Sequence, residues 1–178
     1  MSKSAEAFKG QIKDAEDLLA HFDAQPKPPP ENAEVLKRAG LVMALTAWET
    51  YVEDRTREEL TSRLRVVSGS PVGKFVLAKL EEELKRFHNP TAEKTRKLFL
   101  DFLEVDVTAS WEWQHYDLAK AKKTLDELIA KRGDAVHRSK PQQSGSPPAP
   151  HLVKREDLER HIKFLKSLVE ATDRALAE

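Results

Sequence analysis

The sequence has no cysteine among its 178 residues, which excludes disulfides, thiolate nucleophiles and cysteine-based metal sites. It also lacks any apolar run that approaches the roughly 20 residues needed to cross a bilayer. The first residues, Met1 to Glu6, do not contain the apolar core of a signal peptide. We therefore predict a cytoplasmic protein that makes no contact with a membrane.

A net charge is also missing, because 30 basic residues balance 30 acidic ones. Such a chain has no global positive field to recruit nucleic acid, so any RNA site must be local. One local excess lies between Lys120 and Lys140, where seven basic residues outnumber three acidic ones. This excess is typical of a phosphate-binding patch, and equally of a solvated lysine face.

Glycine is scarce, with six residues, whereas 34% of the residues are charged and 39% are hydrophobic. A composition rich in Leu, Ala, Glu and Lys favours an all-α protein, and the length fits one domain. We predict a single helical domain over residues 1–178. Its parts are an N-terminal helix with a proline-rich linker (1–30), a core (31–138), a flexible loop rich in Pro, Ser and Gly (139–153) and a C-terminal helix (154–178).

The longest apolar pattern runs from residue 31 to about residue 67 and predicts a long central helix. Between residues 39 and 52 it is apolar on nearly every face, so we expect neighbouring helices to bury it all round. Ser70 and Pro71 are typical of an N-cap and a first helical residue, and they predict a helix to about Phe87. Further helices are expected over residues 4–24, 92–103, 117–138 and 154–177.

Arg132 stands where a helical pattern requires an apolar side chain. Leu118, Ala121, Leu125 and Leu128 are spaced by three and four residues, and the next step reaches Arg132. Burying an unpaired guanidinium costs several kcal/mol, so this side chain must face a carboxylate, a phosphate or a water-filled cleft. An anionic partner for Arg132 is therefore expected.

Glu49 is a carboxylate within the apolar part of the central helix, between Trp48 and Tyr51. Three interpretations are open: it is the ion-pair partner of Arg132, it accepts hydrogen bonds as an N-cap, or it lies on a narrow solvated face. We favour a structural role, or one in positioning Arg132, over direct catalysis.

His137 follows Arg132 by five positions, and histidine can both take up and release a proton near neutral pH. An arginine can neutralise charge on a pentacoordinate phosphate while an imidazole moves the proton, so the pair suits RNA cleavage without a metal. On an ideal helix, positions five apart lie about 140° apart around the axis. Either Gly133 loosens the turn, or the two residues converge only with a second copy of the chain.

The chain resembles the HEPN superfamily, whose ribonuclease members carry an arginine and a histidine separated by four to six residues near the end of a long helix. Four residues, 133–136, separate them in this sequence. The segments Ala47–Glu53 (AWETYVE) and His88–Thr91 (HNPT), the latter leading to Trp111, are similar to the branch called RiboL-PSP-HEPN. This likeness covers about residues 31–175 and implies a HEPN-type helical bundle.

The resemblance also implies a metal-independent endoribonuclease that needs no cofactor. His137 deprotonates the ribose 2′-hydroxyl or protonates the leaving oxygen, Arg132 stabilises the phosphorane, and the product carries a 2′,3′-cyclic phosphate. On the same resemblance, we expect Asp134 to orient His137, and Lys131 or Arg138 to hold flanking phosphates. Many active members have a polar residue directly after the arginine, whereas in this chain the acid comes one place later.

Partners implied by the resemblance are RNA and a second copy of the chain, because such proteins typically dimerise with two motifs lining one cleft. They resemble toxins and antiviral defence factors, so a neutralising antitoxin is a further expected partner. The alternative is a catalytically inactive HEPN-like bundle that binds RNA or another protein. Zero net charge and Gly133 favour this alternative.

Two further patterns compete with this assignment. Arg155 and His161 have a similar spacing, but Arg155 lies in the charged start of a helix and is expected to be solvated, while His161 lies at the edge of an apolar stripe. Glu112 and His115 match the Glu-x-x-His spacing of helical di-iron sites, which need two such pairs. No second pair exists in the chain, so we expect no metal site.

Overall fold

The computed structural model describes residues 1–137 and 153–177, including the backbone but not the side chains of residues 134–137. Within these ranges the protein has six α-helices, two short 3-10 helices and no β-strand, which confirms the predicted all-α class. The α-helices are α1 (Lys3–Asp23), α2 (Glu34–Arg63), α3 (Pro71–Leu84), α4 (Ala92–Leu103), α5 (Leu118–His137) and α6 (Arg155–Ala175). The 3-10 helices are η1 (Glu31–Ala33) and η2 (Val107–Ser110).

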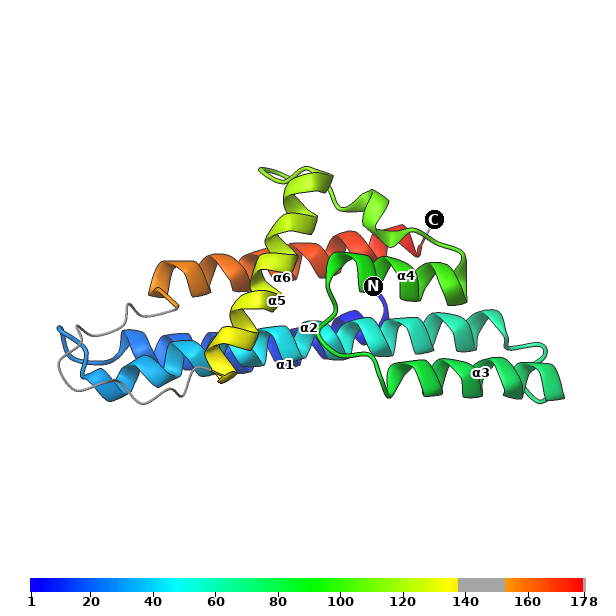
Figure 1. The fold of residues 1–178 in the computed structure, drawn as a ribbon, viewed down its shortest axis with the longest axis horizontal. Helices are drawn as coiled ribbons and strands as arrows, with labels where there is room; N and C mark the ends of the chain where they lie inside the picture. The colour runs from blue at the N-terminus through cyan, green and yellow to red at the C-terminus, as the bar shows by residue number, and fades with distance from the viewer. Residues whose placement is uncertain (138–152, 178) are drawn as a thin grey trace.

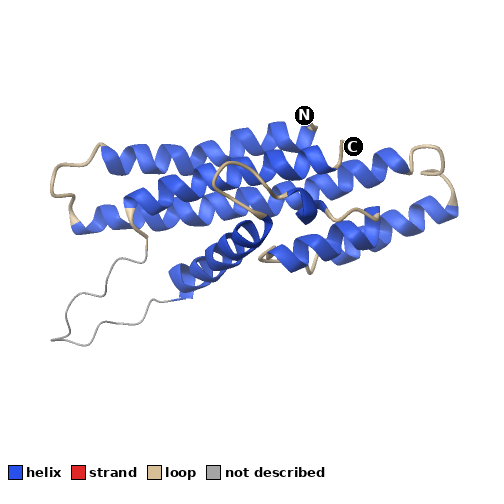
Figure 2. Cartoon of the chain, turned by 90° about the horizontal axis from the view of Figure 1, so that it is seen from above, coloured by secondary structure: helices blue, strands red, loops and turns tan. Residues whose placement is uncertain are grey.

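Helix α2 is the long central helix that the sequence predicts. It has 30 residues and contacts each of the other five α-helices. Helices α1, α2 and α6 lie lengthwise along the molecule, and α5 crosses this layer at a steep angle (Figure 1). The loops that join α2 to α3 and α3 to α4 are short, and a longer segment containing η2 leads from α4 to α5 (Figure 2). No helix in the described ranges is both long and apolar enough to cross a membrane.

Helices α2 and α3 both end earlier than the sequence predicts. Helix α2 ends at Arg63 instead of residue 67, because residues 64–69 form consecutive turns that lead into the N-cap of α3. Ser70 is that cap, and its hydroxyl accepts a hydrogen bond from the amide of Gly73 at 3.1 Å. A Cβ atom at Gly73 would lie 2.1 Å from the carbonyl oxygen of Val67, so only glycine fits this turn. Helix α3 ends at Leu84 instead of residue 87.

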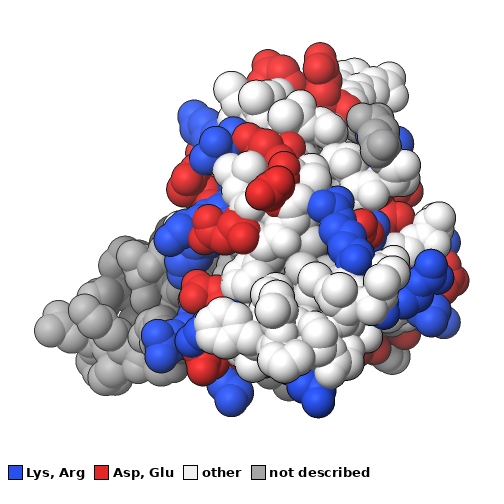
Figure 3. All heavy atoms as spheres, turned by 90° about the vertical axis from the view of Figure 1, so that its right-hand side faces the viewer, with Lys and Arg blue, Asp and Glu red and all other residues white. Residues whose placement is uncertain are grey.

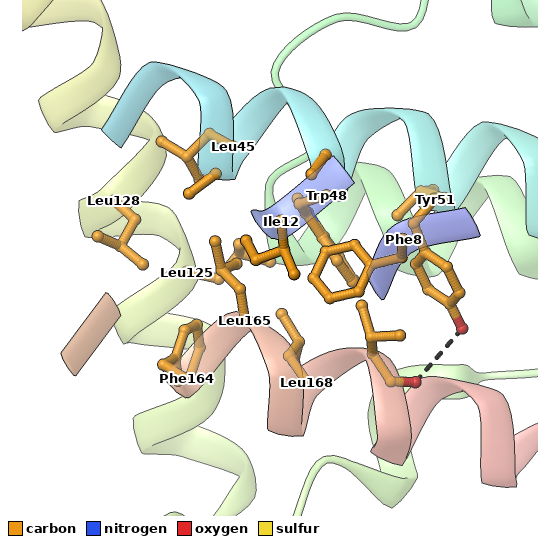
Figure 4. Close-up of a cluster of buried hydrophobic side chains, with 14 of the residues drawn as sticks. Phe8, Ile12, Leu45, Trp48, Tyr51, Leu125, Leu128, Phe164, Leu165 and Leu168 are labelled. Atoms are coloured by element: carbon orange, nitrogen blue, oxygen red, sulfur yellow. Dashed lines mark hydrogen bonds between the residues drawn. The ribbon is translucent and has the colours of Figure 1, made fainter. Parts of the chain in front are cut away.

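Trp48 of α2 lies at the centre of the hydrophobic core. Its ring packs against Tyr51 at a centroid distance of 5.8 Å and against Trp111 at 6.1 Å. The Tyr51 hydroxyl donates a hydrogen bond to the carbonyl oxygen of Val169 in α6 at 3.4 Å (Figure 4). Burial of each large apolar side chain stabilises the fold by about 1.5–3 kcal/mol. Around these rings Figure 4 shows Phe8 and Ile12 of α1, Leu45 of α2, Leu125 and Leu128 of α5, and Phe164, Leu165 and Leu168 of α6.

Two predicted burial positions are wrong. The apolar stripe of α5 is predicted to start at Leu118, but this side chain is 39% exposed because α5 begins at this residue, before it reaches the core. The central helix is not buried all round by the described residues, since Met43 is 36% exposed. Ala121, Leu125 and Leu128 are buried as the stripe predicts.

Apolar side chains are exposed where α2 turns into α3. Val66, Val67, Val72 and Phe75 all lie there, and Phe75 is 62% exposed. Figure 3 views this end of the molecule, where uncharged residues cover much of the surface between scattered charges. The turn between α2 and α3 is therefore stabilised by the Ser70 cap and the close packing at Gly73, and not by burial of these side chains.

His161 of α6 is buried, and in the described part of the chain its Nδ1 atom has no hydrogen-bond partner. Burial, and secondly the positive charge of Lys131, lower the pKa of His161 to about 4, although the negative charge of Asp157 acts in the opposite direction. The folded protein therefore holds this imidazole neutral at pH 7.

We expect this group to make stability depend on pH. Unfolded chains take up the proton at the ordinary pKa of about 6.5, so stability falls as the pH drops from there towards 4, by roughly 3 kcal/mol in full. Urea unfolding at about pH 7 and about pH 4.5 measures the loss, and His161→Gln should lose roughly 2–3 kcal/mol less than the wild type. Equal losses in the two proteins would show that His161 does not carry this dependence.

Candidate functional site

The loop between α3 and α4 is fastened to the central helix by a buried hydrogen bond. The indole Nε1–H of Trp48 donates to the carbonyl oxygen of Pro90 at 3.2 Å, and both residues are buried. A buried hydrogen bond of this kind is costly to break, because the carbonyl would be left unsatisfied away from water. The loop therefore has a fixed position over α2.

Helix α5 holds the other side of the same loop. The carboxylate of Asp126 accepts a hydrogen bond from the amide of Ala92, the first residue of α4, at 2.8 Å. The Thr91 hydroxyl caps the same helix by accepting from the amide of Lys94 at 3.3 Å. An N-terminal amide and a carboxylate suit each other electrostatically, because the helix dipole is positive at this end. The loop is thus clamped between α2 and α5.

Arg132 meets Glu49 where α5 crosses α2. The guanidinium Nη1 lies 2.6 Å from Glu49 Oε2 and donates a second hydrogen bond to Asn89 Oδ1 at 3.2 Å. The side chains of Arg132 and Glu49 are 21% and 16% exposed, so the pair is largely desolvated but still reachable from solvent. Of the three interpretations of Glu49, the ion-pair partner of Arg132 is confirmed.

Asn89 and His88 complete the surroundings of Glu49. Asn89 has a left-handed φ of 53°, a conformation that asparagine tolerates better than most residues. This conformation directs its backbone amide to Glu49 Oε2 at 3.3 Å while its side-chain oxygen faces Arg132. His88 Nδ1 lies 3.6 Å from Glu49 Oε1, and the His88 side chain is 70% exposed.

A second carboxylate lies one helical turn after Glu49. Burial, followed by the negative charge of Glu49, raises the pKa of Glu53. The two carboxylates therefore repel each other, which favours cations beside them. Arg132 supplies such a cation beside Glu49, next to the loop between α3 and α4.

The structure brings only part of the predicted site together. Arg132 and Glu49 are in contact, and Lys131 is exposed beside them on α5 without a contact to Glu49. Asp134 and His137 lie on the last two turns of α5, with side chains outside the described residues, and Arg138 is outside them altogether. The roles of these three residues therefore stay predictions, as does the loop at 139–153, of which only Val153 is described.

The competing Arg155–His161 pattern does not form a second site of this kind. Arg155 is not simply solvated, since its guanidinium donates two hydrogen bonds to the carboxylate of Asp23 at 3.0 and 2.8 Å and also pairs with Glu159. This fastens α6 to the end of α1, while His161 is buried in the core. Among the described residues, no three histidine or carboxylate side chains are grouped so that they could hold a metal ion.

Asn89 and His88 are site residues that the sequence did not predict. They appear there only as part of the segment HNPT, which resembles the family, and neither is predicted to belong to the site. A signal was present: an asparagine directly before a proline and a helix cap is typical of a tight turn with special backbone geometry. The contacts of Asn89 with Arg132 and Glu49 join residues that are 43 and 40 positions apart in sequence, which local patterns do not reveal.

An all-α bundle with a long central helix, crossed by a second helix that carries a paired arginine near its end, is consistent with a HEPN-type helical bundle. Residues 10–178 match the family model described as RiboL-PSP-HEPN. The chain therefore belongs to the RiboL-PSP-HEPN family, and the resemblance found in the sequence is confirmed. No curated protein and no solved structure matches the chain.

We expect the Glu49–Arg132 pair to couple α2 to α5 energetically. In a double-mutant cycle on the free energy of unfolding, Glu49→Gln and Arg132→Met should show a coupling of about 1–2 kcal/mol, because each single change leaves the other group desolvated and poorly paired. Urea unfolding of the four proteins measures it. The matched control is Lys79 with Glu82, an exposed pair within α3, which should couple more weakly. Equal coupling in the two cycles would contradict a special role for Glu49.

Proposed function

We propose that the protein is a metal-independent endoribonuclease of HEPN type. The observation that carries this proposal is the Arg132 guanidinium, which is held in a fixed position by Glu49 and Asn89 yet remains partly exposed. Membership of the RiboL-PSP-HEPN family supports an RNA-related role in general. A preorganised cation of this kind suits charge that develops on a phosphate oxygen, because no reorganisation is needed during the reaction.

In the proposed reaction His137 acts as the acid–base group. The 2′-hydroxyl oxygen of the ribose attacks the adjacent phosphorus, and its proton passes to the imidazole. The bond to the 5′-oxygen of the next nucleotide breaks, and this oxygen takes up a proton from water to leave as a 5′-hydroxyl. Arg132 stabilises the negative charge on the phosphorane, and Glu49 keeps the guanidinium oriented from behind. A phosphate oxygen that replaces Asn89 or water on Arg132 would leave the ion pair with Glu49 in place.

We further propose that the working unit is a homodimer. Helix α5 is continuous from Leu118 to His137, so Gly133 does not interrupt it. Positions 132 and 137 therefore lie about 140° apart around a regular helix, which favours a cleft built from both copies. Among the described residues, no atom lies within 4 Å of a Cβ added at Gly133, which is compatible with close approach of a second copy at this stretch of α5.

Cleavage of a labelled single-stranded RNA in EDTA tests this proposal. We expect wild type to cleave, and both Arg132→Ala and His137→Ala to lose at least about 100-fold in rate, since each removes a charge-stabilising or proton-transferring group. Circular dichroism and sedimentation would confirm that each variant is folded and has the wild-type oligomeric state.

The matched controls are Arg155→Ala and His21→Ala, which remove the same residue types outside the proposed site. Both should cleave within about twofold of wild type. Cleavage by His137→Ala at the wild-type rate would overturn the proposed mechanism. A folded, dimeric wild type that binds RNA but cleaves none of several RNAs would identify the protein as an RNA-binding bundle instead.

A further inference from the structure

A cleft opens between the end of α3 and the start of α4, directly beside the loop that carries His88 and Asn89. It has a volume of about 190 Å³. Phe87 and Leu98 line it with side chains that are otherwise buried in the core. Phe87 and Leu98 are 6% and 3% exposed, so only the edges of these side chains reach the cleft. They give it a small apolar floor, which suits a ligand that is part apolar and part charged.

Three cations surround this floor: Arg86, Lys94 and Lys97. Across residues 1–137 and 153–177, neither Arg86 nor Lys97 has a carboxylate oxygen within 4.0 Å. Lys94 donates from Nζ to the carbonyl oxygen of His88 at 2.7 Å, which is a neutral acceptor. The positive charges of all three side chains are therefore available to an anion, although exposed cations of this kind are partly screened by salt.

The cleft also contains two carboxylates, from Glu83 and Asp101. They make the cleft mixed in charge rather than uniformly basic. A simple phosphate would be repelled by them, whereas a nucleotide would also offer its base amino groups as hydrogen-bond donors. The combination of cations, acceptors and an apolar floor thus fits a nucleotide better than a bare anion.

A continuous chain of contacts joins this cleft to Arg132. Lys94 contacts His88 at 2.7 Å, His88 contacts Glu49 at 3.6 Å, and Glu49 contacts Arg132 at 2.6 Å. His88, with its exposed side chain, lies between the two places. The cleft and Arg132 are therefore linked through Lys94, His88 and Glu49, which favours contact of one RNA strand with both places.

We propose that the cleft of Arg86, Lys94 and Lys97 binds a nucleotide of the single-stranded RNA that flanks the scissile phosphate. This inference rests on the proposed function, since it gives the second contact point of the same substrate. Two separate contacts fix the direction of the strand across the site, which a single arginine cannot do.

The test is the binding of a roughly 12-nucleotide RNA with 2′-O-methyl riboses, which 2′-hydroxyl attack cannot cleave, measured by fluorescence anisotropy. For single strands each lost phosphate contact reduces the salt slope by about 0.7, so Arg86→Gln with Lys97→Gln should reduce it by about 1.4. Arg86→Lys with Lys97→Arg retains both charges and should restore affinity. Lys13→Gln on α1, outside the cleft, is the matched control and should leave the slope unchanged.

The outcomes separate this inference from the proposed function. If the salt slope is unchanged in the double Gln variant, or changes equally in Lys13→Gln, the cleft does not bind RNA. Cleavage that depends on Arg132 and His137 would be unaffected by either result. A wild type that binds the blocked RNA through the cleft but never cleaves unmodified RNA overturns the nuclease and keeps the cleft. Absence of RNA binding by wild type overturns both.

Discussion

The ion pair between Arg132 and Glu49 is the interaction on which the site depends. It fastens the end of α5 to the middle of α2, at 2.6 Å and largely out of water. The helical spacing of α5 directs Arg132 towards the core. Without the carboxylate of Glu49, the guanidinium would be buried there as an unpaired charge. The same carboxylate accepts a hydrogen bond from the backbone of Asn89, so one side chain of the central helix positions both a helix and a loop.

This arrangement explains how a bundle with no net charge can present a local site for an anion. The negative charge of Glu49 offsets the desolvation of the Arg132 guanidinium, and the Arg132 side chain remains 21% exposed. The loop is held rigidly from below by Trp48 and from α5 by Asp126. The site is therefore built on secondary structure rather than on free loops, which is the arrangement that keeps a reactive geometry precise.

Much of this architecture could be predicted from the sequence. The stripe of Ala121, Leu125 and Leu128 correctly predicts that Arg132 points inward, because side chains at three- and four-residue spacing share one helical face. The sequence leaves three roles open for Glu49, since its contact with Arg132 spans 83 positions in the chain. Asn89 was missed for the same reason. The predicted end of α2 lies too late because a tight turn at Gly73 overrides the apolar pattern of Val66 and Val67.

The chemical identity of the cut ends tests the proposed mechanism most directly. Mass spectrometry of the fragments after incubation of wild type with single-stranded RNA in EDTA distinguishes the possible mechanisms by mass. Attack by the 2′-hydroxyl predicts a 2′,3′-cyclic phosphate, or its hydrolysed monophosphate, on the upstream fragment and a free 5′-hydroxyl on the downstream one. A 3′-hydroxyl with a 5′-phosphate would mean that water is the nucleophile, and would contradict the proposed roles of Arg132 and His137.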